Sequence, residues 1–420
     1  MHGEKMTRVF VLSARRTPFG RFGGSLKDLA PEGKLVIELT MIVLKELLEK
    51  ANKSPDEVDE VYWGVGDSSQ CHDVYTPVVL RQAWLKCGFN PKKFTLDIDR
   101  ACCSGMDALM LGYRAILLGE AGVTIGGGVT CFSQEPLIIR GLRWKGYRLG
   151  LENILIEDPL YRLGYKDFNP VAVDTGEVAL EYGVSREEQD MWALRSHQRY
   201  GKAWQEGKFK DEIIPLEVPI KDERGRVVGK KVLEIDEQYR PDASLEKLSK
   251  LPTIYGSPTV TAGNAPGLND GAAGCLIASE EKVGDCKPLG EIVAMAYAAQ
   301  EARYIASVPA YAIIKVLEKA KLSLDDMKLI EINEAFAAQP LVSTKILCQE
   351  YYGGNEEKLK EIREKTNVNG SAIAIGHPNT ASGARLVMHL LYELRRRGGG
   401  YGVAAICGGL AQGSACIVKV

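Results

Sequence analysis

None of the ten cysteines in this 420-residue sequence forms a C-x-x-C pair. Structural zinc sites usually contain such pairs, so the sequence argues against a structural zinc. It also offers no secretory signal, which argues against a disulfide framework. Most of the cysteines are therefore expected to be buried thiols that pack as small apolar side chains.

Long apolar runs and an excess of one charge are missing as well. The first twenty residues contain only the short apolar run FVL, and no later stretch suits a signal peptide or a membrane span. The net charge of −2 gives no long-range field to attract nucleic acid or anionic lipid. The last residues, CIVKV, are not a peroxisomal address. We therefore expect a cytoplasmic protein that binds neither nucleic acid nor membrane.

The length exceeds one usual domain, so two or three compact units are expected. Strand-like segments at 8–13, 60–64, 122–126 and 290–296 alternate with helical stretches such as 31–50, which predicts an α/β fold. Residues 140–250 are richer in charge and aromatics, and they form either a lid or accessory region or a plain third domain. Within them, Ser185 and Glu188 make a capping box that opens a helix.

Two distant segments share one pattern. Ser104 and Gly105 begin a helix-length stretch that leads into GVTIGGG, and Ser382 and Gly383 begin another that leads into GVAAICGG. Two copies of one α/β unit, related by pseudo-symmetry, would explain the pattern; chance similarity of two βα units is the alternative. Pseudo-symmetry would bring both helix starts toward one centre.

Adjacent cysteines at 102 and 103 stand directly before the first of these helices. Residues 106–118 are almost all apolar, so the helix is expected to be buried and its start to lie inside the protein. The amide groups at a helix start favour a thiolate. Two core cysteines before a helix are the alternative, and the better one for an arbitrary CC pair.

Residues far along the chain favour the reactive interpretation. His377 lies in the glycine-rich turn NVNGSAIAIGHP, at nearly the place that Cys102 occupies in the first unit, where a general base would be needed. Cys407 begins CGGLAQG, whose glycine amides can hold an oxyanion. Asn333, in INEAFAAQ, offers a neutral amide donor, although a lone Asn-Glu pair is more often a helix cap.

Taken together, these segments resemble the thiolases, which are acyl-CoA C-acyltransferases. The resemblance runs essentially end to end and is carried by RTPFGRFGGSLKDL (16–29), ACCSG (101–105), VTAGNAPGLNDGAA (260–273), NEAFAAQ (333–339), NVNGSAIAIGHP (367–378) and CGGLAQG (407–413). It implies an α/β fold of five layers, α-β-α-β-α, built from two pseudo-symmetric halves with an inserted loop domain. The N-terminal half would comprise residues 1–131 and 269–290, the loop domain 132–268, and the C-terminal half 291–420.

The resemblance also implies catalytic roles. Cys102 would take the acyl group from a CoA thioester, His377 would activate it, and Cys407 would move the Cα proton of the second substrate. Asn333, through a water, and His377 would form one oxyanion hole. The backbone amides of Cys102 and Gly409 would form the other.

Contacts with CoA carry over less specifically, to Arg240 in DEQYRPD and to Ala262, Pro266 and Ala335. Because CoA thioesters are the substrates, no metal or redox cofactor is implied. The expected partners are acyl-CoA and CoA, in a homodimer or homotetramer. Residues 143–150 lie in the insertion that helps tetramers of this family form.

Three positions, Thr380, Pro266 and Val171, depart from the family pattern, whereas Cys103 fits it. Thr380 follows the GHP motif where glycine is common, and Pro266 replaces a serine that contacts CoA in many members. Val171 stands where a methionine often lines the acyl pocket. Cys103 occupies the motif's small-residue position, so it is expected to be a bystander.

Three functions remain open. A thiolase that makes or cleaves a 3-ketoacyl-CoA, in the simplest case acetoacetyl-CoA, is favoured because Cys102, Asn333, His377 and Cys407 occur together. A thiolase-like protein that binds acyl-CoA or lipid without turnover typically lacks one of these groups. A ketoacyl-synthase-type condensing enzyme is disfavoured by the NEAF stretch and the cluster at Cys407.

Overall fold

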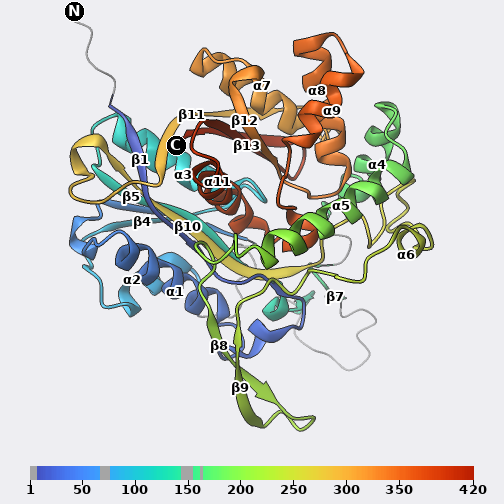
Figure 1. Ribbon diagram of the computed structural model, residues 1–420. Coiled ribbons are helices and arrows are strands. Elements are labelled where there is room, and N and C mark those ends of the chain that lie inside the picture. The colour runs from blue at the N-terminus through green and yellow to red at the C-terminus, as the bar shows by residue number, and fades with distance from the viewer. Residues whose placement is uncertain (1–6, 67–75, 143–154, 161–163) are drawn as a thin grey trace, which may run out of the picture.

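The computed structural model describes residues 7–66, 76–142, 155–160 and 164–420. Within these ranges ten strands form one mixed sheet (Figure 1). Nine of them follow the order β12 (Met327–Ile332), β13 (Tyr401–Gly408), β14 (Gln412–Lys419), β11 (Gly290–Ala299), β1 (Val9–Arg16), β10 (Asn269–Ser279), β5 (Val123–Cys131), β3 (Glu60–Val65) and β4 (Phe94–Ile98). The short strand β2 (Gly20–Arg21) pairs with β10.

The two halves of the sheet repeat one topology. In the first, β3 is parallel to β4 and β5, β5 is antiparallel to β10, and β10 is antiparallel to β1. In the second, β12 is parallel to β13, β13 is antiparallel to β14, and β14 is antiparallel to β11. A single bridge from Ile330 to Thr366 stands where β4 stands in the first half. The halves join where β1 pairs with β11, so the internal repeat seen in the sequence is a repeat of structure.

Helices complete the layers. Between the halves lie α3 (Ser104–Leu117) and α11 (Asn379–Arg396), which pack on each other and on strands of both halves (Figure 1). Helices α1 (Leu35–Lys50) and α2 (Val79–Lys86) cover the outer side of the first half. Helix α7 (Val308–Ala320) covers the outer side of the second half, and α8 (Ala338–Tyr352) lies beside α7. The order helix, sheet, helix, sheet, helix is the predicted α/β fold.

Both central helices are buried along most of their length. Every residue of α3 from Ser104 to Met110 is buried, as its apolar sequence predicted. Every residue of α11 from Thr380 to Leu391 is buried too, although that stretch contains an arginine and a histidine. Both helix starts therefore lie inside the protein, where water competes little for their amide groups.

Glycine allows these helices to approach closely. A Cβ atom on Gly105 would overlap the carbonyl oxygen of Thr380, and one on Gly383 would lie 2.5 Å from the backbone nitrogen of Met106. Real Cβ atoms do not come this close to backbone atoms, so any other residue would push the helices apart. The glycines of the two Ser-Gly pairs are thus contact points between the halves.

The second central helix begins earlier than predicted. It starts at Asn379 rather than at Ser382, because the carbonyl of Pro378 already accepts amide hydrogen bonds from the following turn. As a result, Cys102 and His377 stand two residues ahead of their helices, which begin at 104 and 379. Counted from the Ser-Gly pairs, Cys102 and His377 stand two and five residues ahead, whereas counted from the helix starts each stands two residues ahead. The two residues are therefore more nearly equivalent than the sequence indicated.

The polar insertion packs on both halves. It contains α4 (Val171–Glu181), α5 (Arg186–Gln205), α6 (Leu245–Ser249) and the hairpins of β6 (Ile138–Arg140) with β7 (Leu155–Glu157) and of β8 (Leu216–Lys221) with β9 (Val227–Leu233). The predicted capping box opens α5. Trp192 packs with residues of the C-terminal half, and Tyr200 joins the core around α3 and α11. This packing favours an accessory region over an independent third domain, while the three domain boundaries stay a prediction.

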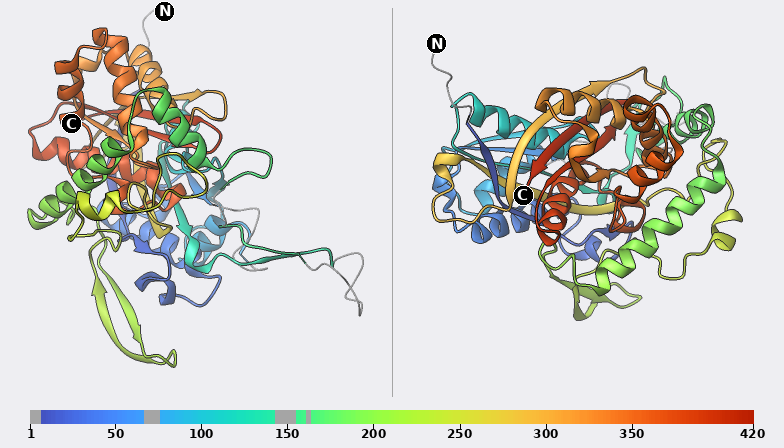
Figure 2. Two further views of the ribbon diagram at one scale, coloured as in Figure 1. Left: turned by 90° about the vertical axis from the view of Figure 1, so that its right-hand side faces the viewer. Right: turned by 45° about the horizontal axis from the view of Figure 1, so that its top comes forward.

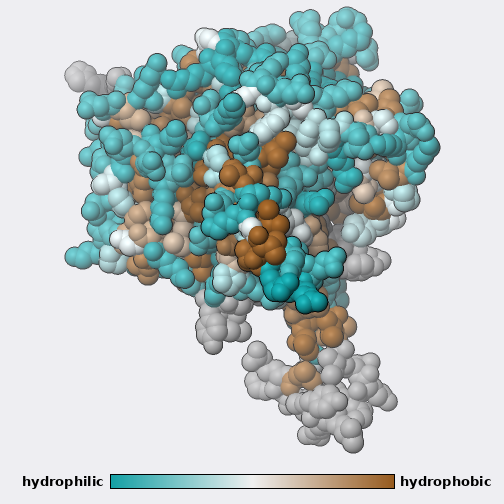
Figure 3. Space-filling view, turned by 60° about the horizontal axis from the view of Figure 1, so that its bottom comes forward, coloured by the Kyte–Doolittle hydropathy of each residue, from teal (hydrophilic) through white to brown (hydrophobic). Residues whose placement is uncertain are grey.

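Both hairpins project from the body of the molecule (Figure 2). In the space-filling view, apolar side chains gather along the projecting β6–β7 hairpin (Figure 3). They include the exposed Ile139, Leu155 and Ile156.

The remaining helices are α9 (Glu356–Glu364) and α10 (Ala372–Ile375). Among the described helices, none has the length and apolar character that a bilayer crossing requires.

Nine of the ten cysteines lie in the described residues, and all nine are thiols outside any disulfide. Six are buried, which agrees with their expected role as small apolar side chains. Cys71 lies outside the described residues.

Candidate active site

Cys102 lies in a tight turn that its neighbours hold in place. Ala101 adopts φ of +50°, a conformation that non-glycine residues rarely use. The hydroxyl of Ser104 accepts a hydrogen bond from the amide of Arg100 at 2.7 Å and donates one to the carbonyl of Ala101 at 2.6 Å. The two residues of the first Ser-Gly pair thus act differently: Gly105 allows close packing of α11, and Ser104 stabilises the turn by hydrogen bonds. Cys102 itself is partly exposed.

Cys103 points away from this turn into the core. Its thiol is fully buried and lies 3.7 Å from the carbonyl oxygen of Ile406 and 3.9 Å from that of Gln412. Burial raises the pKa of Cys103 above its usual value. A thiol that stays protonated is a poor nucleophile, so Cys102 is the member of the pair that suits nucleophilic chemistry.

Replacing Cys103 with alanine should leave turnover within a few-fold of wild type. The change removes a buried sulfur, which should lower the free energy of unfolding by about 1–2 kcal/mol. Steady-state kinetics and thermal unfolding would test the two expectations. A hundredfold loss of turnover would mean that Cys103 takes part in the chemistry.

His377 is held by polar contacts at its backbone and both ring nitrogens. Its backbone N–H donates to Asn269 Oδ1 at 2.8 Å, Nδ1 lies 2.6 Å from Ser382 Oγ, and Nε2 lies 3.5 Å from Asn333 Nδ2. Because the Ser382 hydroxyl donates to the carbonyl of Pro378 at 3.3 Å, it accepts from Nδ1–H. The network therefore assigns the tautomer in which Nε2 is free to take a proton.

The imidazole is also kept neutral. Burial, and after it the positive charge of Arg385, lowers the pKa of His377 to about 3. At neutral pH the ring is therefore uncharged and can accept a proton. A neutral imidazole with an unprotonated Nε2 has the properties of a general base.

Replacing Ser382 with alanine should weaken His377 as a base. Nδ1–H would lose its acceptor, and a buried unsatisfied N–H costs about 1–3 kcal/mol. If that cost falls on the reactive tautomer, kcat/KM should drop roughly tenfold to a hundredfold. The rate at which iodoacetamide alkylates Cys102 should fall in parallel. Unchanged alkylation and turnover would show that Ser382 does not control the tautomer.

Asn333 follows the last residue of β12 and continues its pairing, since its backbone N–H bonds to the carbonyl of Ala405 at 3.0 Å. Its side-chain Oδ1 accepts a hydrogen bond from Arg385 at 3.3 Å, and Nδ2 faces His377. The helix-cap alternative for the Asn-Glu pair is wrong, because the next helix, α8, begins only at Ala338.

Glu334 is a buried anchor. Its carboxylate accepts hydrogen bonds at 2.8 to 3.1 Å from Trp192, Ser196, Asn367 and the backbone of Ile373. These donors belong to α5 and to the NVNGSAIAIGHP segment. The carboxylate therefore ties both segments to the position next to Asn333.

Cys407 is the next-to-last residue of β13 and is fully buried. Burial, reinforced by electrostatic interaction with Cys102 and Cys103, raises the pKa of Cys407 far above its usual value, while a hydrogen bond from Gln339 acts in the opposite direction. The CGG turn also lies against the Cys102 turn, since a Cβ atom on Gly408 would be 3.0 Å from the carbonyl oxygen of Arg100. A thiol that stays protonated at neutral pH suits proton transfer better than nucleophilic attack.

The NEAFAAQ segment connects these groups. Asn333 contacts His377, while Gln339 contacts Cys407, which interacts with Cys102. The residues come from the ends of β12 and β13 and from the starts of α3 and α11. Of the five catalytic residues predicted from the sequence, four are thus linked through this segment.

The fifth predicted catalytic residue, Gly409, lies beside Tyr165 of the insertion. A Cβ atom on Gly409 would overlap the hydroxyl of Tyr165. Among the predicted CoA contacts, Ala335 is buried in the apolar cluster that contains Cys407, and the partly buried Val171 packs on that cluster. Arg240 and Ala262 are exposed, and Pro266 is partly buried. Their contacts with CoA stay a prediction.

The departure at Thr380 has a structural consequence. Its hydroxyl donates to the carbonyl of Val129 at 2.6 Å and lies 3.0 Å from the hydroxyl of Thr130, to which its backbone N–H also donates. Gly64 and Gly128 leave room for it, since a Cβ atom on either would crowd Thr380. Thr380 therefore fastens the start of α11 to β5.

Sequence reasoning missed several polar residues around the site, namely Asn269, Gln339, Ser382 and Arg385. Gln339 was the last residue of a quoted motif, and Ser382 was half of a repeated pair, so both carried a signal. Arg385 carried none, because an arginine within a helix usually indicates an exposed face.

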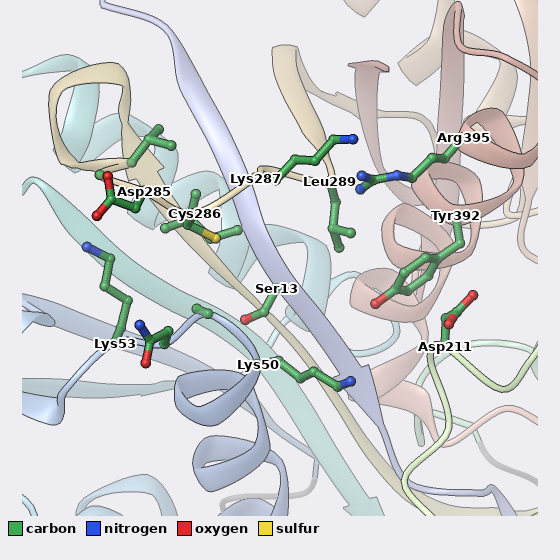
Figure 4. A pocket seen from close by; sticks show the side chains of 15 residues that line it. Ser13, Lys50, Lys53, Asp211, Asp285, Cys286, Lys287, Leu289, Tyr392 and Arg395 are labelled. Carbon is green, nitrogen blue, oxygen red and sulfur yellow. The ribbon is translucent and has the colours of Figure 1, made fainter.

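A surface cavity of about 710 Å³ lies elsewhere (Figure 4). Lys50, Lys53, Lys287 and Arg395 line it, together with the thiol of Cys286. It is at the opposite end of α11 from His377, roughly 25 Å away at 1.5 Å per helical residue. Burial raises the pKa of Cys286, so this thiol is a poor nucleophile.

Known proteins resemble the chain along its whole length. It is 39% identical over 417 residues to human mitochondrial 3-ketoacyl-CoA thiolase, covering 98% of each chain. It is 36% identical over 421 residues to an acetyl-CoA acetyltransferase of Syntrophomonas wolfei, covering 99% of this chain and 100% of that one. The crystal structure of the human mitochondrial thiolase in complex with CoA superposes with a TM-score of 0.86 at 38% identity, covering 99% of this chain and 98% of that one.

Two family models account for nearly all of the chain. The model of the thiolase N-terminal domain matches residues 9–281, and that of the thiolase C-terminal domain matches residues 286–420. The chain therefore belongs to the thiolase family.

Proposed function

We propose that this protein is an acyl-CoA C-acyltransferase that joins two acyl-CoAs or cleaves a 3-ketoacyl-CoA, with acetoacetyl-CoA as the simplest substrate. One observation carries the proposal: the turn that holds a partly exposed thiol, Cys102, packs against the turn that begins at a fully buried thiol, Cys407, and burial strongly raises the pKa of Cys407. The reaction needs one sulfur that attacks and another that moves protons. The names of the relatives support the substrate class and leave open which acyl length this chain prefers.

Cleavage begins with attack by Cys102. Its proton passes to Nε2 of His377, and its sulfur bonds to the ketone carbon of the 3-ketoacyl-CoA. The bond from this carbon to Cα then breaks, and its electron pair enters the departing thioester as an enolate. The enolate oxygen would be held by His377, now protonated, and by a water on Asn333. The thiol of Cys407 gives its proton to Cα, which releases acetyl-CoA.

Release of the second product reverses the roles. The thiol of a free CoA gives its proton to the Cys407 thiolate, and its sulfur attacks the acyl group on Cys102. The backbone amides of Cys102 and Gly409 would stabilise the resulting oxyanion. The sulfur of Cys102 then leaves and recovers its proton from His377. Both thiols and the imidazole end as they began, and condensation follows the same steps in reverse.

A spectrophotometric assay tests the proposal. The protein is mixed with acetoacetyl-CoA and CoA, and the loss of the enolate absorbance is followed. Longer 3-ketoacyl-CoAs are then compared to obtain the chain-length preference. A loss that depends on CoA supports a thiolase. Absence of loss with every chain length would exclude the activity and favour a thiolase-like binding protein.

We also infer a homodimer that forms along β4, the last strand of the sheet. Within the described part of the chain no strand pairs with the outer edge of β4, and such an edge readily pairs with a second chain. Phe94 and Leu96 of β4 are 50% and 39% exposed. The exposed apolar side chains of the β6–β7 hairpin, Ile139, Leu155 and Ile156, would join two such dimers into a tetramer (Figure 3). The segment 143–150 that suggested tetramers lies outside the described residues. Sedimentation equilibrium would distinguish monomer, dimer and tetramer.

The cytoplasmic location stays a prediction, since the human relative is mitochondrial. The expectation that no further cofactor is used also stays a prediction. Activity of protein purified in the presence of a chelator, without added cofactor, would support it.

A further inference from the structure

We propose that Arg385 is a positioning residue for the reaction: it holds the side-chain amide of Asn333 so that the N–H group, and not the carbonyl, faces the reacting atoms. The inference rests on the roles proposed above for Asn333 and His377. It adds a residue to the site that no motif in the sequence indicated.

Arg385 is fully buried in the middle of α11. Burying a guanidinium is strongly unfavourable unless its donors are satisfied. Here Nε and Nη1 have no hydrogen-bond partner, and the hydrogen bonds of Arg385 come only from Nη2. Stabilisation of the fold therefore does not explain why a charged arginine occupies this buried position.

Arg385 forms an ion pair with Glu331, but the pair is long and offsets only part of the cost of burying the guanidinium. The carboxylate closest to Arg385 is that of Glu331, with Oε2 at 3.7 Å from Nη1, beyond hydrogen-bond distance. Oε2 of Glu331 has no hydrogen-bond partner either. Burial raises the pKa of Glu331 to about 7, so this carboxyl is not held firmly in its charged form.

The two hydrogen bonds that Nη2 does make reach the candidate site. One goes to Asn333 Oδ1 at 3.3 Å, and the other to Ser371 Oγ at 3.0 Å. Asn333 belongs to the NEAFAAQ segment and Ser371 to the NVNGSAIAIGHP segment. Arg385 itself lies on the helix that follows His377. One buried side chain therefore joins the three segments that position Asn333 and His377.

The chemistry of the guanidinium decides the direction of the amide. An arginine only donates hydrogen bonds, so it can be satisfied by Oδ1 of Asn333 but not by Nδ2. With Oδ1 held, Nδ2 is the group that faces Nε2 of His377 at 3.5 Å. A flipped amide would accept a hydrogen bond from the water on Asn333 instead of donating one to it, and that water would then be a weaker donor to the enolate oxygen.

The charges around Arg385 are mixed. Glu331, Glu212 and Glu334 favour its charged form, whereas burial and Arg16 disfavour it. Its charge also lowers the pKa of His377, after burial itself. Because burial is the larger cause, His377 should stay neutral without the guanidinium, whose distinct effect is to fix the direction of the neighbouring amide.

Two reactions separate a positioning role from a structural one. Exchange of labelled CoA into acetyl-CoA requires only acyl transfer to and from Cys102, whose oxyanion is held by backbone amides. Thiolysis of acetoacetyl-CoA also requires the enolate, which Asn333 helps to hold. Both are measured over a range of substrate concentrations up to saturation, for the wild type and for Arg385→Met, Arg385→Gln, Arg385→Lys and Glu331→Gln. Thermal unfolding identifies the folded variants.

Arg385→Met should lower kcat for thiolysis about 10²-fold, the usual effect of losing one oxyanion contact, with KM and the exchange rate changed at most a few-fold. Arg385→Gln should behave alike, because glutamine can donate or accept and does not select one amide direction; it serves if the methionine variant does not fold. Arg385→Lys, which only donates, should recover part of the rate. Glu331→Gln, the matched control, should keep both reactions.

Equal losses in thiolysis and exchange, or no loss in thiolysis, would overturn the proposal. So would a loss in Glu331→Gln as large as that in Arg385→Met, because it would assign the effect to the buried charges in general. Failure of the proposed function looks different, since the wild-type protein itself would then perform neither reaction.

Discussion

Replacing Cys102 with serine should abolish acyl transfer to the enzyme, with turnover reduced by at least about 10⁴-fold. The serine hydroxyl is far less acidic than a thiol, and a neutral imidazole such as His377 would not ionise it well enough. The variant should fold normally, because Cys102 is only partly buried and serine is nearly the same size. Mass spectrometry of the intact protein after incubation with acetyl-CoA would detect the acetyl group.

The neighbouring cysteine provides the control for this experiment. Cys103→Ala should still be acetylated, because its thiol is buried against backbone carbonyls and stays protonated. An acetylated Cys102→Ser protein would show that the acyl group is carried elsewhere. Acetylation lost in Cys103→Ala and kept in Cys102→Ser would exchange the roles of the two cysteines.

Replacing Cys407 with alanine should separate the two halves of the reaction. The protein should still be acetylated at Cys102, because the CoA sulfur can leave as a thiolate without a proton from Cys407. Condensation and thiolysis, which need a proton transfer at Cα, should fall by about 10²–10⁴-fold, the usual contribution of a general acid or base. Alanine cannot exchange a proton with Cα, yet it fits the buried position in β13. Single-turnover labelling by acetyl-CoA and steady-state thiolysis measure the two halves separately.

Cys416→Ala is the matched control, since Cys416 is equally buried and lies on β14, the strand paired with β13. It removes the same sulfur from the same sheet, so it should keep both half-reactions. Near-normal thiolysis by Cys407→Ala would remove Cys407 from the mechanism. Loss of acetylation in that variant would mean that the two sulfurs do not have separate roles.

Read together, the two cysteine variants test the central feature of the site. The partly exposed thiol at a helix start and the buried thiol at a strand end differ in environment, although they interact. Desolvation disfavours a charged thiolate, so the more buried sulfur holds its proton more strongly. A difference in burial thus gives two chemically identical side chains different tasks.

Much of this could be read from the sequence, because the relevant signals are local. Alternating strand and helix patterns indicated the α/β fold, and the apolar stretch after Ser104 indicated a buried helix. The repeated Ser-Gly pair indicated two related units, which the sheet topology confirms. The capping box at Ser185 opens α5, since it depends on residues within one turn.

Other features were decided only by the tertiary structure, because they depend on groups that are far apart in the chain. Such long-range contacts decide three features of the site: the close approach of Gly105 to Thr380, the tautomer of His377 and the orientation of Cys103. Arg385 is the clearest case. Its sequence neighbourhood is that of an ordinary helix, and only the packing of α11 between two halves of the sheet buries its charge. Local residue patterns therefore determined which elements form and which residues are reactive, while burial and long-range hydrogen bonds decided the protonation and direction of each group.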